Sequence, residues 1–433
     1  MPATRGEIST GADAAAAHTR RQIALRLLPF VFVLYITNYL DRTNVAYAAL
    51  EMSHDLGFSD RVFGLGAGIF FVGYVALQIP GALLVERWSA RRCITIIMVA
   101  WGSLTVLTAL VHSSGQLYFA RFVLGAAEAG FFPGIVVYLS HWFIREDRAK
   151  ATGNFMAAIP LSFIIGSPVA GWILGHHWLD TEGWRWLFVM EGLPAVLLGV
   201  AAFFYLTDWP AEAAWLRPQQ REWITRTLEQ EKPPKIGRVN IWRALSSRPV
   251  LLLAAAAFLE YFVFYTMAFW FPTILKRLSG LSNARIGILG TVPYLACLVA
   301  MLINGWHSDK RGERRIHSAI PLFIGAAGLL GLLTLPGSLW LTMVLFSMLG
   351  VIHSFLAPFW ALPTEILGES AAATAVGFIN AVGSVAGFAG PYAFGYLNTR
   401  TGSFSAGLTA MLICCLAGGV LLLRAPEAPQ LPA

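Results

Sequence analysis

Residues 28–50 read LPFVFVLYITNYLDRTNVAYAAL, an apolar segment long enough to cross a lipid bilayer. Asp41 and Arg42 lie inside this segment. A second apolar segment, residues 117–139 (LYFARFVLGAAEAGFFPGIVVYL), contains Arg121 and Glu128. A charge at the centre of a membrane helix costs at least about 2.5–3.5 kcal/mol. Four such charges in two segments indicate a polar cavity, and a polar cavity across a bilayer indicates passage of a polar solute or an ion.

The rest of the chain is also apolar. Of its 433 residues, 57% are hydrophobic and 13% are charged, and the mean hydropathy is +0.63, whereas soluble domains contain about 25% charged residues. The pattern predicts an all-α integral membrane protein with twelve transmembrane helices. The predicted helices are 25–49, 61–85, 94–112, 117–140, 150–174, 184–207, 248–274, 285–307, 316–335, 339–361, 372–397 and 402–424. The polar N-terminus predicts no cleavable signal peptide.

The net charge of +7 follows from topology. Most Lys and Arg fall on segments that would share one side of the membrane with both termini. The segments predicted for the other side hold only Arg61, Arg185, Lys276, Arg277, Arg285 and Arg400. By the positive-inside rule both termini are expected in the cytoplasm. The basic excess therefore predicts a lipid bilayer as the partner and no nucleic acid.

The longest polar stretch, residues 208–247, divides the chain into two sets of six predicted helices. Within it, residues 211–231 are interpreted as a charged linker, in preference to a helix along the membrane surface. The expected organisation is a cytoplasmic tail (1–24), a six-helix bundle (25–207), the cytoplasmic linker (208–247), a second six-helix bundle (248–424) and a C-terminal tail (425–433).

A short signal occurs in both halves. Residues 305–315 read GWHSDKRGERR, and residues 82–92 read ALLVERWSARR, so each has an acid, a base and then a basic pair at matching spacing. Internal repeats of this kind are typical of secondary transporters. The alternative, that both turns are only positive-inside loops, is less favoured because a topology signal needs no acid. The residues proposed for a cytoplasmic gate are Glu86, Arg87, Asp309, Lys310, Arg311 and Arg314.

The 305–315 turn resembles the cytoplasmic loop motif of the major facilitator superfamily; the copy at 82–92 is degenerate. Residues 38–44 (NYLDRTN), 121–133 (RFVLGAAEAGFFP) and 183–194 (GWRWLFVMEGLP) resemble the anion:cation symporter family within it. The resemblance implies two pseudo-symmetric bundles and alternating access for small carboxylates such as tartrate or sugar acids. The same resemblance implies a location in a bacterial inner membrane. It also implies that Tyr74 and Asn380 neighbour the substrate. Packing of tyrosine between helices is an equal alternative.

Seven residues separate Arg121 from Glu128, so the two share a helix face about 10.5 Å apart along the axis. Counted from the helix ends, Asp41 lies at a depth between them, and a four-charge cluster is expected. A proton on Asp41 or Glu128 would release an arginine, Arg42 or Arg121, to hold a carboxylate through two parallel hydrogen bonds. A static buried ion-pair network is the alternative. Asn38 and Tyr265 are further candidates for the cavity lining.

Three more ionisable residues lie at membrane depth. Glu191 is interpreted as structural, paired with Arg185 or nearby backbone. Glu260 has no evident partner, and His353 is interpreted as a packing residue in preference to a proton relay. No catalytic, metal or nucleotide motif is present, so the sequence predicts no enzyme and no cofactor beyond a proton gradient. The prediction is a monomeric proton-coupled symporter of a small organic anion. An uncoupled facilitator or exchanger and a non-transporting receptor remain alternatives.

Overall fold

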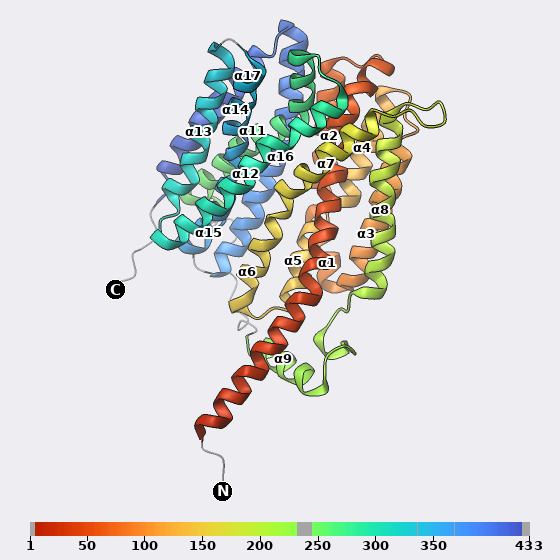
Figure 1. Ribbon diagram of the computed structural model, residues 1–433. Helices are drawn as coiled ribbons and strands as arrows, with labels where there is room; N and C mark the ends of the chain where they lie inside the picture. The colour runs from red at the N-terminus through yellow and green to blue at the C-terminus, as the bar shows by residue number, and fades with distance from the viewer. Residues whose placement is uncertain (1–4, 232–244, 336, 368, 427–433) are drawn as a thin grey trace.

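The chain folds into a bundle of long helices (Figure 1). The computed structural model describes residues 5–231, 245–335, 337–367 and 369–426, with side chains omitted at 5–13, 149–150, 152–155 and 369–373. Within these ranges there are helices and no strands, as the sequence predicts. The remaining parts of the linker and of the two tails, residues 232–244, 1–4 and 427–433, lie outside the described residues.

The first half of the chain contains α1 (Arg5–Asp55), α2 (Asp60–Arg87), α3 (Ala90–Thr108), α4 (Ser114–Glu128), α5 (Phe131–Ser140), α6 (Arg145–Met156), α7 (Ala158–Leu174) and α8 (Gly183–Tyr205). A 3-10 turn, η1 (Pro210–Glu212), and α9 (Pro218–Gln230) follow. The second half contains α11 (Arg248–Ser279), α12 (Asn283–Arg311), α13 (Arg315–Thr334), α14 (Leu339–Gly350), η2 (Val351–Phe355), α15 (Leu356–Ile366), α16 (Glu369–Thr401) and α17 (Ser405–Leu423).

Eleven helical segments in the described ranges are long and apolar enough to cross a membrane. The fifth predicted span differs, because α7 is only a 17-residue apolar helix and the polar α6 precedes it. Three spans are interrupted, and each interruption ends three residues before a proline: Pro133, Pro160 or Pro358. Proline has no N–H to donate to the carbonyl four residues earlier, which explains why the helix is interrupted there.

Helix α1 begins far earlier than the predicted start at residue 25. Its N-terminal extension is braced, because the Arg20 guanidinium donates two hydrogen bonds of 2.6 Å to the Asp147 carboxylate on α6. Farther along, Arg26 lies over the rings of Tyr205 and Trp215, 4.7 and 4.8 Å from their centroids. Residues 211–231, interpreted as a linker, thus include a helix, α9, and the side chain of Gln220 on α9 bonds Gln22 of α1.

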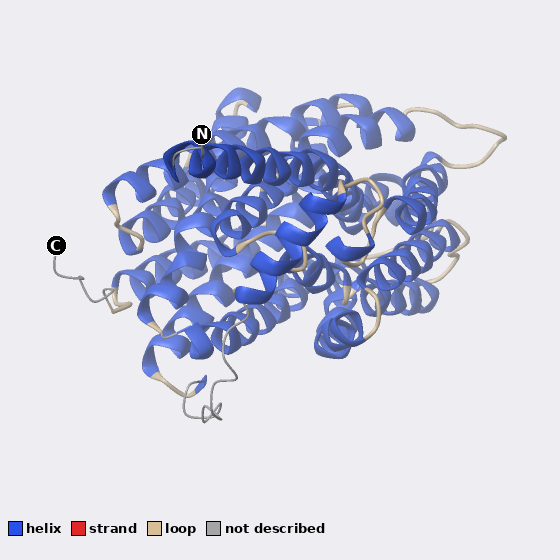
Figure 2. Ribbon diagram, turned by 90° about the horizontal axis from the view of Figure 1, so that it is seen from below, coloured by secondary structure: helices blue, strands red, loops and turns tan. Residues whose placement is uncertain are grey.

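Helix α1 begins and helix α17 ends at the lower end of the bundle in Figure 1, and Figure 2 views the molecule from that side. We call this end the terminal face; it carries α9 and the turns at Trp88–Ser89 and Gly312–Arg314. The opposite end, the distal face, carries the turns at Leu56–Ser59 and Gly280–Ser282. The two halves meet through three helix pairs: α1 with α11, α2 with α16, and α7 with α12.

Glycines bring the two halves together near the distal face, along a contact that we call the seam. An added Cβ at Gly64 on α2 would lie 2.5 Å from the carbonyl oxygen of Pro391 on α16. At Gly287 on α12 it would lie 2.4 Å from the carbonyl oxygen of Ser167 and 2.8 Å from Cα of Gly171, both on α7. Backbone therefore packs directly on backbone, as is usual for small residues between membrane helices.

A wedge at this seam should separate the halves. We expect Gly287→Leu to favour conformations open at the distal face, because the side chain has no space between α12 and α7. Paired spin labels on the two halves at the distal face would show longer distances in this variant. Gly115→Leu is the matched control, since a Cβ at Gly115 meets no atom within 4 Å. An unchanged distance distribution in Gly287→Leu would contradict the expectation.

Candidate functional site

Glu128 is the centre of a buried polar cluster between α1 and α4. Its Oε2 atom accepts hydrogen bonds from Asn38 Nδ2 at 2.9 Å and from the Arg42 guanidinium at 3.1 Å. All three side chains are buried, with Glu128 fully excluded from solvent. Asn38 and Arg42 are four residues apart on α1, so they lie one above the other on a single helix face. That face of α1 is turned toward α4.

Arg121 lies next to this pair and is also fully buried. Its Nη2 atom donates a 3.5 Å hydrogen bond to the backbone carbonyl of Arg42. Its Nε and Nη1 atoms have no hydrogen-bond partner in the described part of the chain. Buried guanidinium groups normally have their donors satisfied. Arg121 therefore offers unused donors to an anion.

Two glycines determine how closely the aromatic residues of α2 approach these arginines. An added Cβ at Gly125 on α4 would lie 1.9 Å from the carbonyl oxygen of Phe70, and one at Gly73 on α2 would lie 2.1 Å from that of Phe122. The two helices therefore touch through their backbones. As a result the Phe70 ring lies 4.8 Å from the Arg121 guanidinium, a cation–π contact of the kind that favours a positive charge without neutralising it.

Asp41 does not join the arginines, contrary to the expected four-charge cluster. Its Oδ1 atom accepts a 3.3 Å hydrogen bond from Asn44, its Oδ2 atom has no partner within the described residues, and the carboxylate faces Trp101 and Thr105 of α3. Successive residues of an α-helix point about 100° apart, because there are 3.6 residues per turn. Arg42 is directed toward α4, so its neighbour Asp41 is directed toward α3.

The other predicted lining residues are distributed over three helices. The Arg42 guanidinium lies 4.9 Å from the centroid of the Tyr74 ring on α2. Tyr265, on α11 in the second half, is buried, and its ring centroid is 4.4 Å from that of Phe71. Asn380 on α16 is half-buried, and among the described residues its side chain has no hydrogen bond. The structure thus places Tyr74 against the Arg42 guanidinium, and Tyr265 is close enough to interact with Arg42 electrostatically.

Comparisons with known proteins agree with this architecture. The family model of the Major Facilitator Superfamily matches residues 31–391. The chain belongs to the Major Facilitator Superfamily. It is a multi-pass membrane transporter and not an enzyme.

Two relatives and one solved structure illustrate the likeness. A candidate tartrate transporter of Agrobacterium vitis is 40% identical over 94% of this chain and 95% of the relative. A quinolone resistance transporter of Acinetobacter baumannii is 35% identical over 93% of each chain. The fold is shared with a bacterial homologue of the human lysosomal transporter Spinster, in an inward-facing, unoccupied conformation. That match has a TM-score of 0.75 and 18% identity, and it covers 94% of this chain and 97% of the other.

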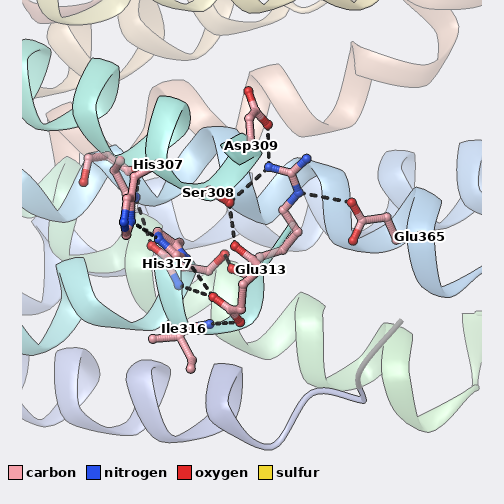
Figure 3. A network of polar contacts seen from close by, with 11 residues as sticks. His307, Ser308, Asp309, Glu313, Ile316, His317 and Glu365 are labelled. Carbon is pink, nitrogen blue, oxygen red and sulfur yellow. Dashed lines mark hydrogen bonds and ion pairs between the residues drawn. The ribbon is translucent and has the colours of Figure 1, made fainter. Parts of the chain in front are cut away.

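In this superfamily member the loop between α12 and α13 contains a polar network at the terminal face (Figure 3). Arg314 donates to Asp309 at 2.5 Å, to Ser308 at 3.0 Å and, through Nε, to Glu365 of α15 at 3.1 Å. Gly312 ends α12 with a positive φ of 63°, which glycine adopts without strain. The Lys310 ammonium lies 5.2 Å from the Trp306 ring, and Arg311 is exposed. Sequence reasoning missed Glu365 because it lies on another helix.

Glu313 links this loop to a pair of histidines. Its carboxylate accepts from the backbone N–H of Ile316 at 2.7 Å and contacts His317 Nδ1 at 2.7 Å, while His317 Nε2 lies 2.7 Å from His307 Nδ1 (Figure 3). Partial burial raises the pKa of Glu313, but the hydrogen bonds from Ile316 and His317 outweigh it, so the pKa lies below its ordinary value. The Glu313 carboxylate is therefore ionised at neutral pH.

The corresponding turn after α2 is built differently. Glu86 and Arg87 are both exposed, and neither forms an ion pair among the described residues. The acid that secures this turn is Asp208, whose carboxylate accepts from Ser89 Oγ at 2.7 Å and from the Arg91 backbone N–H at 2.9 Å. Asp208 lies just after α8, too far along the chain for the local spacing to reveal it.

The Asp309 side chain is 73% exposed in this conformation, and its ion pair with Arg314 lies within its own half. An exposed ion pair contributes little to stability. We therefore expect Asp309→Asn to leave the thermal stability nearly unchanged. We also expect the variant to transport more slowly, because contacts of Asp309 that form when the terminal face closes would be lost and conformations open at that face would be favoured. Glu86→Gln should act in the same direction but more weakly. Distance labels across the terminal face check the shift; an unchanged distribution in Asp309→Asn would show that the loop is only a topology signal.

Polar contacts between the halves gather at the distal face. Asp60 on α2 accepts hydrogen bonds from Arg277 of α11 and Asn398 of α16. Asn283 Nδ2 of α12 donates to Glu51 of α1 at 2.7 Å. These contacts all lie at the distal face. We call the residues of these contacts the distal lock. Sequence analysis did not identify them, because polar residues are expected at the ends of membrane helices whether or not they form contacts.

Glu191 does not pair with Arg185, contrary to one reading of the sequence. Arg185 lies near the distal end of α8, where it pairs with Glu182 at 3.0 Å and donates to the carbonyl of Ala109 at 2.6 Å. Glu191 lies two turns farther along α8 and lines a small cavity with Asn44, Tyr47 and Ser167. The two residues are six apart in the sequence, so they point to different faces of α8.

Proposed function

We propose that this transporter carries small organic anions, of the size and charge of tartrate or a sugar acid, in symport with protons. The observation that supports the proposal most directly is the buried Arg121 beside the Arg42–Glu128 pair, with two donor atoms that have no partner among the described residues. A carboxylate is the ligand that a planar guanidinium holds best, through two parallel hydrogen bonds. The relative named for tartrate supports the same class of substrate.

The proposed coupling step follows from the charge of the cluster. Arg42 and Glu128 neutralise each other, whereas a proton on Glu128 removes the negative partner and leaves both arginines available. A monocarboxylate or dicarboxylate can then bind Arg42 and Arg121 together. Release of the proton restores the Arg42–Glu128 pair and weakens the hold on the anion. Asp41, on the other side of α1, is proposed to take part in proton transfer through a separate path.

The proposed orientation follows from charge. The terminal face carries most of the basic residues, so it is assigned to the cytoplasm of a bacterial inner membrane. With the seam closed at the distal face, the conformation described here then corresponds to the inward-facing state of an alternating-access cycle. We propose that the protein works as a monomer.

Uptake into proteoliposomes tests the proposal. Purified protein is tested with radiolabelled tartrate, a sugar acid and a monocarboxylate, with and without an inward proton gradient, while a pH dye inside the vesicles reports proton entry. We expect accumulation of at least one anion only with the gradient, accompanied by acidification of the lumen. Uptake without acidification would contradict proton coupling, and no uptake of any carboxylate would contradict the substrate class.

A second candidate function is export of drugs that carry a carboxylate. It is suggested by the relative named for quinolone resistance. The same vesicles are loaded with a fluorescent quinolone and tested with an inward and with an outward proton gradient. This experiment discriminates the two candidates. Faster quinolone efflux with a gradient, combined with no gradient-driven uptake of carboxylates, would favour export.

A further inference from the structure

A second acid–base pair is buried in the other half of the molecule, away from the arginines. Glu260 on α11 is fully buried and His353 in η2 is 3% exposed. His353 Nδ1 lies 3.0 Å from Glu260 Oε1. The second atom of each group, Glu260 Oε2 and His353 Nε2, has no hydrogen-bond partner in the described part of the chain.

Aromatic side chains surround this pair. The His353 ring stacks on Phe264 at 3.7 Å between centroids and lies 6.4 Å from both Tyr261 and Phe355. The titratable groups that face the pair are Tyr261 on α11, Cys297 on α12 and Cys415 on α17, all ordinarily neutral near pH 7. Among the described side chains Glu260 interacts with no charged group other than His353.

The charge of such an isolated pair depends on one proton. With a neutral imidazole and an ionised Glu260, a single negative charge is buried among apolar groups, which is unfavourable. One added proton, on either residue, makes the pair neutral overall. A second proton would leave a buried positive charge. The environment therefore favours one bound proton, and losing that proton requires contact with water or with another acceptor.

The backbone that carries His353 departs from α-helical geometry at η2, and residues of α12 pack against this segment. Pro358 cannot donate to the carbonyl of Ser354, and that carbonyl instead accepts a 2.9 Å hydrogen bond from Asn304 Nδ2 of α12. Gly350, at the start of the interruption, would clash with the carbonyl oxygen of Pro293 at 2.4 Å if it carried a Cβ. A short 3-10 segment inside a helix often marks a hinge. Bending at η2 would change the position of His353 relative to Glu260.

The pair is also connected to the proposed substrate site through α11. Tyr261, next to Glu260, has its ring centroid 5.9 Å from that of Tyr265, which is a predicted lining residue. A single aromatic contact thus separates the surroundings of His353 from those of the anion. Movement of α11 or of η2 during the cycle would change both the surroundings of His353 and those of the proposed anion site.

We propose that Glu260 and His353 form a second proton-binding site, in the second half of the transporter, that is filled and emptied once per transport cycle. The step is a simple transfer: a proton from water on one side adds to the Glu260 carboxylate–His353 imidazole pair, and the same proton leaves to water on the other side. This inference rests on the proposed proton-coupled function. The Glu260–His353 site would carry one proton per anion in addition to the proton carried by the Arg42–Glu128 cluster.

Proton-to-anion ratios test this proposal. Wild type, Glu260→Gln and His353→Asn are compared in proteoliposomes, with radiolabelled tartrate, or another carboxylate that the uptake screen identifies, and an internal pH dye. We expect both variants to lose one proton per anion and to retain anion counterflow at equal pH. Cys415→Ala, which alters a neutral neighbour of the pair, should keep the wild-type ratio. A wild-type ratio in both Glu260→Gln and His353→Asn would overturn the inference and leave the proposed function intact.

A second measurement needs no substrate. Infrared difference spectra of the purified proteins between acidic and alkaline pH report protonation of buried carboxyl and imidazole groups. We expect a pH-dependent band in wild type that is absent from Glu260→Gln and altered in His353→Asn, with both variants eluting as folded protein. Superimposable spectra from wild type and Glu260→Gln would overturn proton binding at this site, whatever the protein transports.

Discussion

Replacing Arg121 by alanine is expected to abolish anion transport while leaving the fold intact. Arg121 has no carboxylate partner in the described residues, so its removal leaves no buried acid unpaired. Each hydrogen bond to a charged group contributes about 1.5–3 kcal/mol. Loss of two such bonds to a carboxylate therefore weakens binding by about 3 kcal/mol or more, at least a hundredfold. Anion binding to purified protein and uptake into proteoliposomes measure the effect.

Two controls separate binding from stability. Arg121→Lys keeps the charge but loses the forked geometry, so it should bind the anion more weakly than wild type and better than Arg121→Ala. Arg226→Ala, on α9 with a side chain 71% exposed, should transport as wild type. Arg42→Ala is a poorer test, because it leaves Glu128 buried without its partner, at a cost of about 3–5 kcal/mol. Wild-type uptake by well-folded Arg121→Ala would contradict the proposed role.

Glu128→Gln is expected to lower gradient-driven accumulation by the contribution of one coupled proton and to retain counterflow. Glutamine has the shape of a permanently protonated glutamate, so Arg42 stays available for the anion but no proton can be released. A gradient of one pH unit is worth about 1.4 kcal/mol per coupled proton, or about tenfold accumulation. We expect this factor to be lost if the gradient acts through Glu128. Uptake and counterflow of the same radiolabelled carboxylate are measured in parallel.

Asp41→Asn is the informative companion to this variant. Asp41 does not contact either arginine, so its neutralisation should leave anion affinity close to that of wild type and should impair only proton transfer. Normal accumulation by both Glu128→Gln and Asp41→Asn would place proton coupling elsewhere in the molecule. The pair Glu260–His353 would then be the first group to test in their place.

Depth in the membrane could be predicted from the sequence, but direction around a helix could not. Hydropathy alone located the spans and showed that Asp41, Arg42, Arg121 and Glu128 lie inside them. Which neighbour each charge faces depends on the rotation of α1 about its own axis, and that rotation is fixed by contacts such as that of Leu40 on α1 with Gly166 on α7. Only the folded structure therefore shows that Asp41 faces α3 whereas Arg42 faces α4.

The interruptions within the spans show a similar limit. Pro133, Pro160 and Pro358 are visible in the sequence, but Pro272 and Pro293 lie inside helices that continue without interruption. Proline alone therefore does not locate a break; the breaks also need neighbours that satisfy the released carbonyl groups, as Asn304 does for Ser354. The contacts of Asp208 and Glu365 were equally hidden, because each joins segments that are distant along the chain.

Because α1 is so long, the position of its N-terminal end depends strongly on the conformation of the transporter. The helix has 51 residues, which at 1.5 Å per residue makes a rod of about 76 Å, and much of it projects beyond the terminal face (Figure 1). Because Arg20 binds α6, the N-terminal part of α1 must move together with the first half when that half rotates about the seam. A slight rotation of that half thus becomes a large displacement at the tip, where a probe attached near Ala14 would follow individual turnovers.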